Sequence, residues 1–174
     1  QDITSGLDER TVIATALPIA AFGNTLPLMM PRHSAATSCI LLGLLNSVVC
    51  DYVARQKVGG VHLTFFILKQ LALPALSSIP GDLGLELAKR VAGITCHAKE
   101  LEGMSEEVKS EIDFELVPFG TPRDAARAEI EAISARIYGL TRNEFIYVWD
   151  PRSVYGDDFP SETFSTLKKN EMRV

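Results

Sequence analysis

Six side chains that can contact nucleic acid gather between residues 55 and 69. Basic and polar side chains beside an approachable backbone can lie along a phosphate backbone or enter a groove. The same stretch also fits a core helix with a solvated basic end, and composition leaves both interpretations open. The candidate residues surround the only pair of adjacent glycines in the chain: Arg55, Gln56, Lys57, Gly59, Gly60, His62, Thr64 and Lys69, with Arg32 as a further candidate for a phosphate contact.

The motifs of two kinds of enzyme are absent from the chain. Enzymes that methylate adenine at N6 hold the flipped base with an Asn/Asp-Pro-Pro-Tyr/Phe tetrapeptide, and none occurs here. No glycine-rich loop follows a strand pattern to hold S-adenosylmethionine. Asp82, Glu86 and Lys89 share a short span, but they suit a helix start and a helix surface better than a metal-dependent nuclease. We therefore expect no catalytic residue, no metal site and no cofactor in this chain itself.

A long apolar helix is expected to position the basic stretch. Apolar side chains repeat at helical spacing over residues 38–53, and Asp51 and Arg55 stand one turn apart in the order that favours an ion pair. Either Gly59 or Gly60 is predicted to end this helix with a positive φ. Residues 62–71 fit either a buried strand or a short helical turn followed by a strand.

The rest of the chain predicts an α+β, mostly helical fold, with a small N-terminal β element, a long central helix and a C-terminal helical extension. The β element is a pair of strands over residues 11–17 and 26–30, joined by a turn at Gly23-Asn24. We expect one domain over residues 1–75 and a helical extension over 76–174, with a linker at 72–83 and a solvated stretch at 102–120. Further helices are predicted over residues 83–101, from Thr121-Pro122 to Gly139, from Thr141 with Glu144 as a capping box, and from Ser161.

Charge is unevenly distributed along the 174 residues. The net charge of −5 argues against a nucleic-acid partner, because a basic excess is the usual footprint of such proteins. Residues 1–75 carry five Lys or Arg against four acids, whereas the remaining residues carry twelve against eighteen. Three cysteines without metal-ligand spacing are expected to be buried thiols and indicate a cytoplasmic protein. No apolar run is long and charge-free enough to span a membrane.

The basic stretch also carries a resemblance to a known family. The run D-Y-V-A-R-Q-K-V-G-G-V-H-L-T-F-F-I-L-K-Q-L resembles a segment from bacterial adenine-N6 DNA methyltransferases of restriction-modification systems, including the single-chain type IIG restriction enzymes. In that family the segment lies in the C-terminal target-recognition region. The runs D-I-T-S-G-L-D-E-R-T-V-I-A-T-A-L-P and A-E-I-E-A-I-S-A-R-I-Y-G-L-T-R-N-E-F-I-Y-V-W-D resemble the same family. The resemblance covers residues 1–75 and 128–172, and the middle of the chain is unmatched.

The resemblance implies that the chain is a fragment of a larger DNA methyltransferase. It would act in recognition of double-stranded DNA, beside a methyltransferase domain of the same parent chain that binds S-adenosylmethionine. The alternative is a structural or assembly module that packs on the methyltransferase domain or on a second copy, without direct DNA contact. A basic strip through Arg32, Arg55, Lys57 and Lys69 would favour DNA, and scattered positions would favour assembly.

Overall fold

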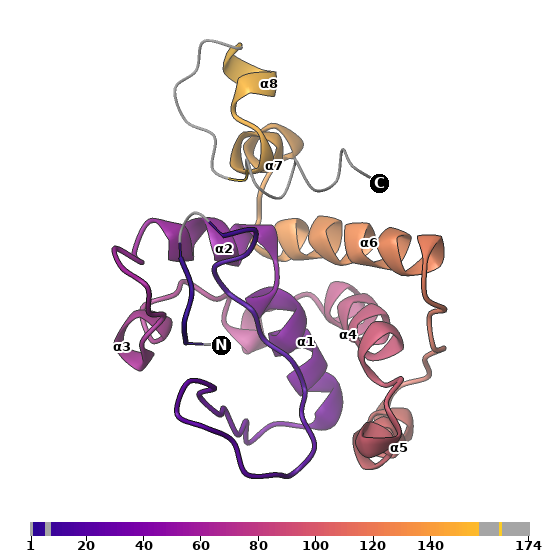
Figure 1. The fold of residues 1–174 in the computed structure, drawn as a ribbon. Helices are drawn as coiled ribbons and strands as arrows, with labels where there is room; N and C mark the ends of the chain where they lie inside the picture. The colour runs from indigo at the N-terminus through magenta and orange to yellow at the C-terminus, as the bar shows by residue number, and fades with distance from the viewer. Residues whose placement is uncertain (1, 6–7, 157–163, 165–174) are drawn as a thin grey trace.

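The computed structural model describes residues 2–5, 8–156 and 164, and it is mostly helical (Figure 1). Helices α7 and α8 stand at one end of the molecule, beyond α2 and α6, and α5 lies at the opposite end. The helices are α1 (Ala35–Leu45), α2 (Val48–Arg55), α3 (Phe65–Leu68), α4 (Gly81–Thr95), α5 (Glu102–Glu111), α6 (Thr121–Ile137), α7 (Arg142–Trp149) and α8 (Arg152–Tyr155), with short 3-10 helices η1 (Leu76–Ser78) and η2 (Lys99–Leu101).

The predicted N-terminal β element is not found among the described residues. They contain no strand, and their one β-type pairing is an isolated antiparallel bridge between Ile3 and His62. Residues 12–17, which are predicted to form a strand, have no regular secondary structure. Side chains take the place of a neighbouring strand, because Asn46 and Asp51 bind the backbone of residues 11–14.

The predicted long central helix is two helices, α1 and α2, whose axes are bent by 53°. The break lies at Asn46 and Ser47. The Ser47 hydroxyl accepts a hydrogen bond from the backbone N–H of Cys50 at 3.2 Å and so caps α2. The Asn46 side chain donates to the carbonyl of Leu42 at 2.9 Å. Asn and Ser compete for backbone hydrogen bonds, which is why they favour helix ends over helix interiors.

The prediction that Gly59 or Gly60 has a positive φ is wrong. Positive φ occurs among the described glycines at Gly120, Gly139 and Gly156. Helix α2 ends earlier, at Arg55, and the chain leaves it through a right-handed turn in which the amides of residues 57 and 58 both donate to the carbonyl of residue 54 at 2.9 Å. A tight turn of this kind needs no left-handed residue, so the glycines are not required for the helix to stop.

The largest core cluster lies where α1, α4, α5 and α6 meet. It includes Leu44, Val108 and Ile130, so residues on both sides of the predicted boundary at residues 75 and 76 share one core. Helices α1 and α4 approach closely at Gly43, where an added Cβ would lie 2.8 Å from a methyl carbon of Val91. Two smaller clusters lie beneath the N-terminal segment, around Val12 and Ala54, and beneath α7, around Val48, Val148 and Phe164.

The C-terminal half follows the sequence prediction in part. The capping box at the start of α7 is confirmed, with the Thr141 amide donating to Glu144 at 2.7 Å and the Glu144 amide donating to the Thr141 hydroxyl at 3.3 Å. The helix predicted over residues 83–101 is α4, which ends at Thr95, and the stretch predicted as solvated contains α5. Helix α6 begins at Thr121, but Gly120 occupies the cap position. The helix predicted from Ser161 falls on residues that, apart from Phe164, lie outside the described part of the chain.

No single helix in the described ranges is long and apolar enough to cross a membrane. Helices α1 and α2 meet that test only as a pair, and the pair is bent by 53°. Cys39, Cys50 and Cys96 are buried free thiols, as the sequence predicts.

Candidate nucleic-acid interface

The predicted nucleic-acid residues fall into two groups. Arg55 uses its guanidinium inside the fold, and Thr64, although exposed, uses its hydroxyl to cap α3. The others are exposed on the loops that flank α1, α2 and α3: Arg32, Gln56, Lys57, Gly59, Gly60, His62 and Lys69.

Arg55 is a structural residue. Its side chain is 5% exposed, and its Nε donates to Asp51 Oδ2 at 2.7 Å, which confirms the predicted i,i+4 ion pair. Its Nη2 donates to the backbone carbonyls of Asp8 at 2.9 Å and Glu9 at 2.8 Å. The guanidinium carbon also lies 4.6 Å from the centre of the Phe164 ring. These partners engage the guanidinium, so Arg55 does not present a free charge to a phosphate.

Thr64 and His62 have local partners as well. The Thr64 hydroxyl accepts a hydrogen bond from the Ile67 amide at 3.4 Å. The side chain therefore caps the N-terminus of α3. His62 is about half exposed, and its Nδ1 lies 3.4 Å from a carboxylate oxygen of Asp2.

Asp51 is the most deeply buried acid among the described residues and organises the site around it. It has 0% exposure, and its Oδ1 accepts hydrogen bonds from the amides of Thr11 at 2.8 Å and Val12 at 2.7 Å while its Oδ2 binds Arg55. A buried carboxylate is tolerable only when it is paired and hydrogen-bonded, and three donors meet that condition. The sequence predicted the pair with Arg55, but not this burial or the bonds to residues 11 and 12.

A second carboxylate, Glu131 on α6, holds the same N-terminal segment. It binds Arg10 at 2.8 Å and accepts a hydrogen bond from the Val48 amide at 2.7 Å, which satisfies the first amide of α2. Burial raises the pKa of Glu131, and the Arg10 guanidinium and the Val48 amide oppose that rise. Sequence reasoning missed Glu131. Residues 8–14, which these groups hold against α2 and α6, are called the N-terminal strap below.

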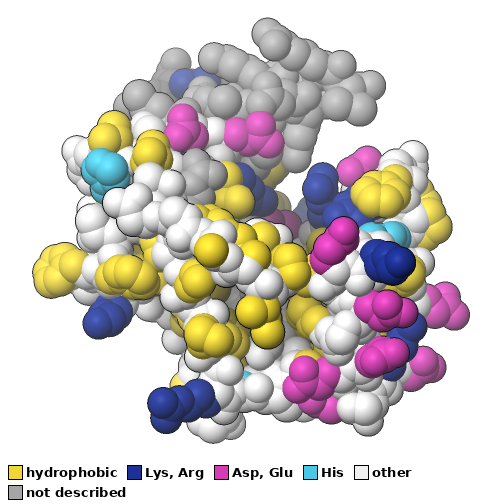
Figure 2. All heavy atoms as spheres, turned by 60° about the horizontal axis from the view of Figure 1, so that its bottom comes forward, with side chains coloured by type: hydrophobic (Ala, Val, Ile, Leu, Met, Phe, Trp, Pro, Cys, Tyr) yellow, Lys and Arg dark blue, Asp and Glu magenta, His cyan; other side chains and the backbone are white. Residues whose placement is uncertain are grey.

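A broad apolar surface lies beside the strap. Figure 2 shows hydrophobic side chains gathered over the N-terminal segment and the side of α3, whereas acidic side chains gather on the side of α5. Ile19 is fully exposed, and Met30 and Phe66 are exposed by 85% and 76%. We call this set the apolar surface; its members are Ile13, Leu17, Ile19, Leu28, Met29, Met30, Phe65 and Phe66.

The part of the chain that carries the apolar surface contributes no exposed acid of its own. Between residues 10 and 81 the only acid is Asp51, which is buried. The exposed cations of the same stretch are Arg32, Lys57 and Lys69. The exterior formed by residues 10–81 is therefore apolar and weakly cationic.

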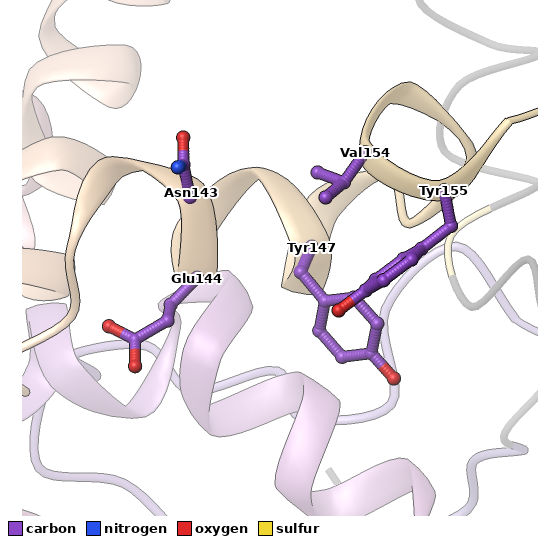
Figure 3. Close-up of a pocket in the computed structure, with 5 residues that line it drawn as sticks. All are labelled: Asn143, Glu144, Tyr147, Val154 and Tyr155. Atoms are coloured by element: carbon purple, nitrogen blue, oxygen red, sulfur yellow. The ribbon is translucent and has the colours of Figure 1, made fainter.

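A shallow pocket of about 200 Å³ lies between α7 and α8 (Figure 3). The rings of Tyr147 and Tyr155 meet edge to face there, with centres 5.5 Å apart. The carboxylate of Glu144, which also lines the pocket, is bound by the amide and the hydroxyl of Thr141, and these bonds lower its pKa. The pocket thus offers no unpaired carboxylate for catalysis. Within the described ranges, no three His, Cys, Asp or Glu side chains come together as metal ligands.

Comparison with protein-family models, with curated proteins and with solved structures gives no match for this chain.

Proposed function

We propose that this chain is an assembly module of a restriction-modification DNA methyltransferase, which packs on the methyltransferase domain of its parent chain through the apolar surface. The observation that carries the proposal is that many large hydrophobic side chains are exposed at residues 13–30 and on α3, and Figure 2 shows hydrophobic side chains gathered on one face of the molecule. Single exposed hydrophobic residues are common, but contiguous patches mark interaction surfaces. Full burial of each such side chain is worth about 1.5–3 kcal/mol, so several together would stabilise a complex substantially.

The polar residues support assembly over DNA contact. Arg55, the candidate with the most specific chemistry, binds Asp51 and the backbone carbonyls of residues 8 and 9 with its guanidinium. The net charge of −5 opposes approach to a phosphate backbone. The parent enzyme itself is proposed from the sequence resemblance, with S-adenosylmethionine bound in its methyltransferase domain.

A second candidate function, recognition of double-stranded DNA, is favoured by one observation. Residues 10–81 expose no acid of their own and carry Arg32, Lys57 and Lys69 on their exterior, while the carboxylate of Asp2 lies 3.4 Å from His62. Phosphate contacts from these three cations would give a salt-dependent affinity. In this second candidate, Gln56, His62 and the backbone at Gly59 and Gly60 would lie near the groove.

The assembly proposal is tested in the parent enzyme by changing exposed residues of the apolar surface. We expect the triple variant Ile19→Asp, Met30→Asp, Phe66→Asp to lose DNA methylation because the module no longer packs on its neighbour. The same variant of the isolated chain should keep the wild-type melting temperature, since these side chains are exposed. Leu85→Asp is a control, because Leu85 is 40% exposed and lies on α4 rather than among the residues of the apolar surface. Wild-type methylation by the triple variant would contradict the proposal.

The DNA candidate is separated from assembly by a salt titration. The variant Arg32→Ala, Lys57→Ala, Lys69→Ala leaves the apolar surface and the Asp51 cluster intact. If these residues contact phosphates, DNA binding by the parent enzyme weakens, and the dependence of log K on log salt falls by about 0.9 for each contact. Unchanged affinity and slope would exclude these residues from the DNA interface. Arg55 is left out of this variant because its loss would damage the fold.

A further inference from the structure

We infer that the surface at the α1–α2 break is a binding site for a peptide segment, filled in this chain by the N-terminal strap and able to accept the same residues from a second copy. The inference does not depend on the proposed function. It rests on the contacts that hold the strap, because side chains of the helices bind its backbone N–H and C=O groups as a receptor binds a peptide.

Side chains at the α1–α2 break and on α2 form hydrogen bonds mainly with backbone groups of the strap. The Asn46 side chain makes two bonds to one residue, accepting from the Ala14 amide at 3.0 Å and donating to the Ala14 carbonyl at 3.0 Å. Asp51 Oδ1 accepts hydrogen bonds from the amides of Val12 and Thr11. Arg55 donates to the carbonyls of residues 8 and 9. Asn46 thus contacts the strap from the break between α1 and α2, and Asp51 and Arg55 contact it from α2.

Buried or paired side chains of the strap supply selectivity. Val12 is 3% exposed and packs into the apolar cluster that includes Leu45 and Ala54, while Arg10 pairs with Glu131. Ile13, between two bound residues, is 45% exposed. Thr11 is 1% exposed, so the buried strap residues are the adjacent pair Thr11 and Val12, whose amides both donate to the same oxygen of Asp51. The site therefore suits a segment in which a cation is followed directly by two buried residues, the second of them apolar, and then by a small residue two positions further on.

The connection behind the strap allows exchange between copies. Residues 15–33 contain no helix or strand and are mostly exposed. Fully extended, this connection reaches roughly 60 Å, which exceeds the diameter of about 30–40 Å expected for a compact chain of this length. The covalent link keeps the chain's own strap at a millimolar effective concentration, so the intact chain favours its own strap over a free peptide. Cutting the link removes this advantage.

The experiment cuts that link in the folded full-length chain. A specific protease site is inserted between Gly23 and Asn24, in an exposed turn, and the folded protein is cut after a fluorophore has been attached at its N-terminus. Displacement of the labelled fragment by a synthetic peptide of residues 1–17 is followed by fluorescence anisotropy, and helical content is followed by circular dichroism. We expect the cut protein to stay helical and the peptide to displace the fragment in a saturable way.

Matched peptides and one protein variant make the test specific. The Ile13→Asp peptide should compete as well as the wild-type peptide, whereas the Val12→Asp peptide should not compete. Asn46→Ala in the protein removes two hydrogen bonds to the strap and should weaken peptide binding about tenfold. Failure of the wild-type peptide to displace the fragment, equal competition by Val12→Asp, or loss of helix on cutting alone would each overturn the inference.

Discussion

Replacing Asp51 by Ala removes the carboxylate that joins the strap to α2. Three donors then lose their acceptor in the interior: the amides of Thr11 and Val12 and the Nε of Arg55. Removing one partner of a buried ion pair costs about 3–5 kcal/mol, because the other charge is left without compensation. We take about 4 kcal/mol for Asp51→Ala. Unfolding entropy near 2.1 cal/mol/K per residue converts this, for a chain of this length, into a fall in melting temperature of roughly 10 °C.

Thermal and urea unfolding followed by circular dichroism measure the effect directly. Asp51→Asn should fall between the wild type and Asp51→Ala, because its side-chain oxygen still accepts from the two strap amides while the charge opposite Arg55 is lost. Asp124→Ala is the control: this acid on α6 is exposed and lies 3.8 Å from Arg127, and exposed pairs contribute about 0–1 kcal/mol. A melting temperature for Asp51→Ala equal to that of Asp124→Ala would refute the assignment of Asp51 as the anchor of the strap.

Three further predictions concern other parts of the structure. Burial raises the pKa of Cys39 and of Cys50 to about 12, so both thiols should resist a thiol reagent at pH 8 in the folded protein and react after unfolding; rapid labelling of the native protein would contradict this. Hydrogen bonds from Ser34 and from two amides of α1 lower the pKa of Glu111, so its stabilising contribution is present above the unfolded pKa of about 4.5 and is lost as the pH falls through the lower folded pKa. Glu111→Gln should therefore lower the melting temperature at pH 7, with a difference that shrinks below pH ~4.5, and a difference independent of pH would argue against the helix-capping role. Gly43→Ala should cost about 1–3 kcal/mol in urea unfolding, because the new Cβ would lie 2.8 Å from a side-chain methyl of α4; a neutral effect would show that α1 and α4 can separate without cost.

Local features of the sequence predicted local features of the fold. The capping box of Thr141 and Glu144 and the pair of Asp51 and Arg55 each depend on residues within one helical turn, so spacing alone identifies them. The break between α1 and α2 was missed although Asn46-Ser47 is a local signal, because the apolar repeat continues on both sides of it.

Long-range contacts explain what the sequence could not predict about the candidate site. Arg10 and Glu131 meet across 121 positions, and no local pattern links them. The composition of residues 11–17 predicted a strand. The backbone of residues 11, 12 and 14 instead bonds to the side chains of Asn46 and Asp51, and the positions of these side chains depend on the tertiary fold. The sequence predicted Arg55 as a phosphate ligand. Its burial against residues 8 and 9 depends on the same tertiary packing, so the sequence alone could not predict that its guanidinium is already bound.

Oxidation of two adjacent methionines tests the central claim, that the apolar surface packs on a neighbouring domain. Met29 and Met30 are 49% and 85% exposed in the isolated chain, so dilute peroxide should oxidise both quickly, and mass spectrometry of the peptide that contains them gives the rate. The same measurement in the proposed parent methyltransferase should give a rate at least about tenfold lower, since methionine sulfur buried in an interface is shielded from oxidant. Equal oxidation rates in the isolated chain and in the proposed parent enzyme would contradict the claim.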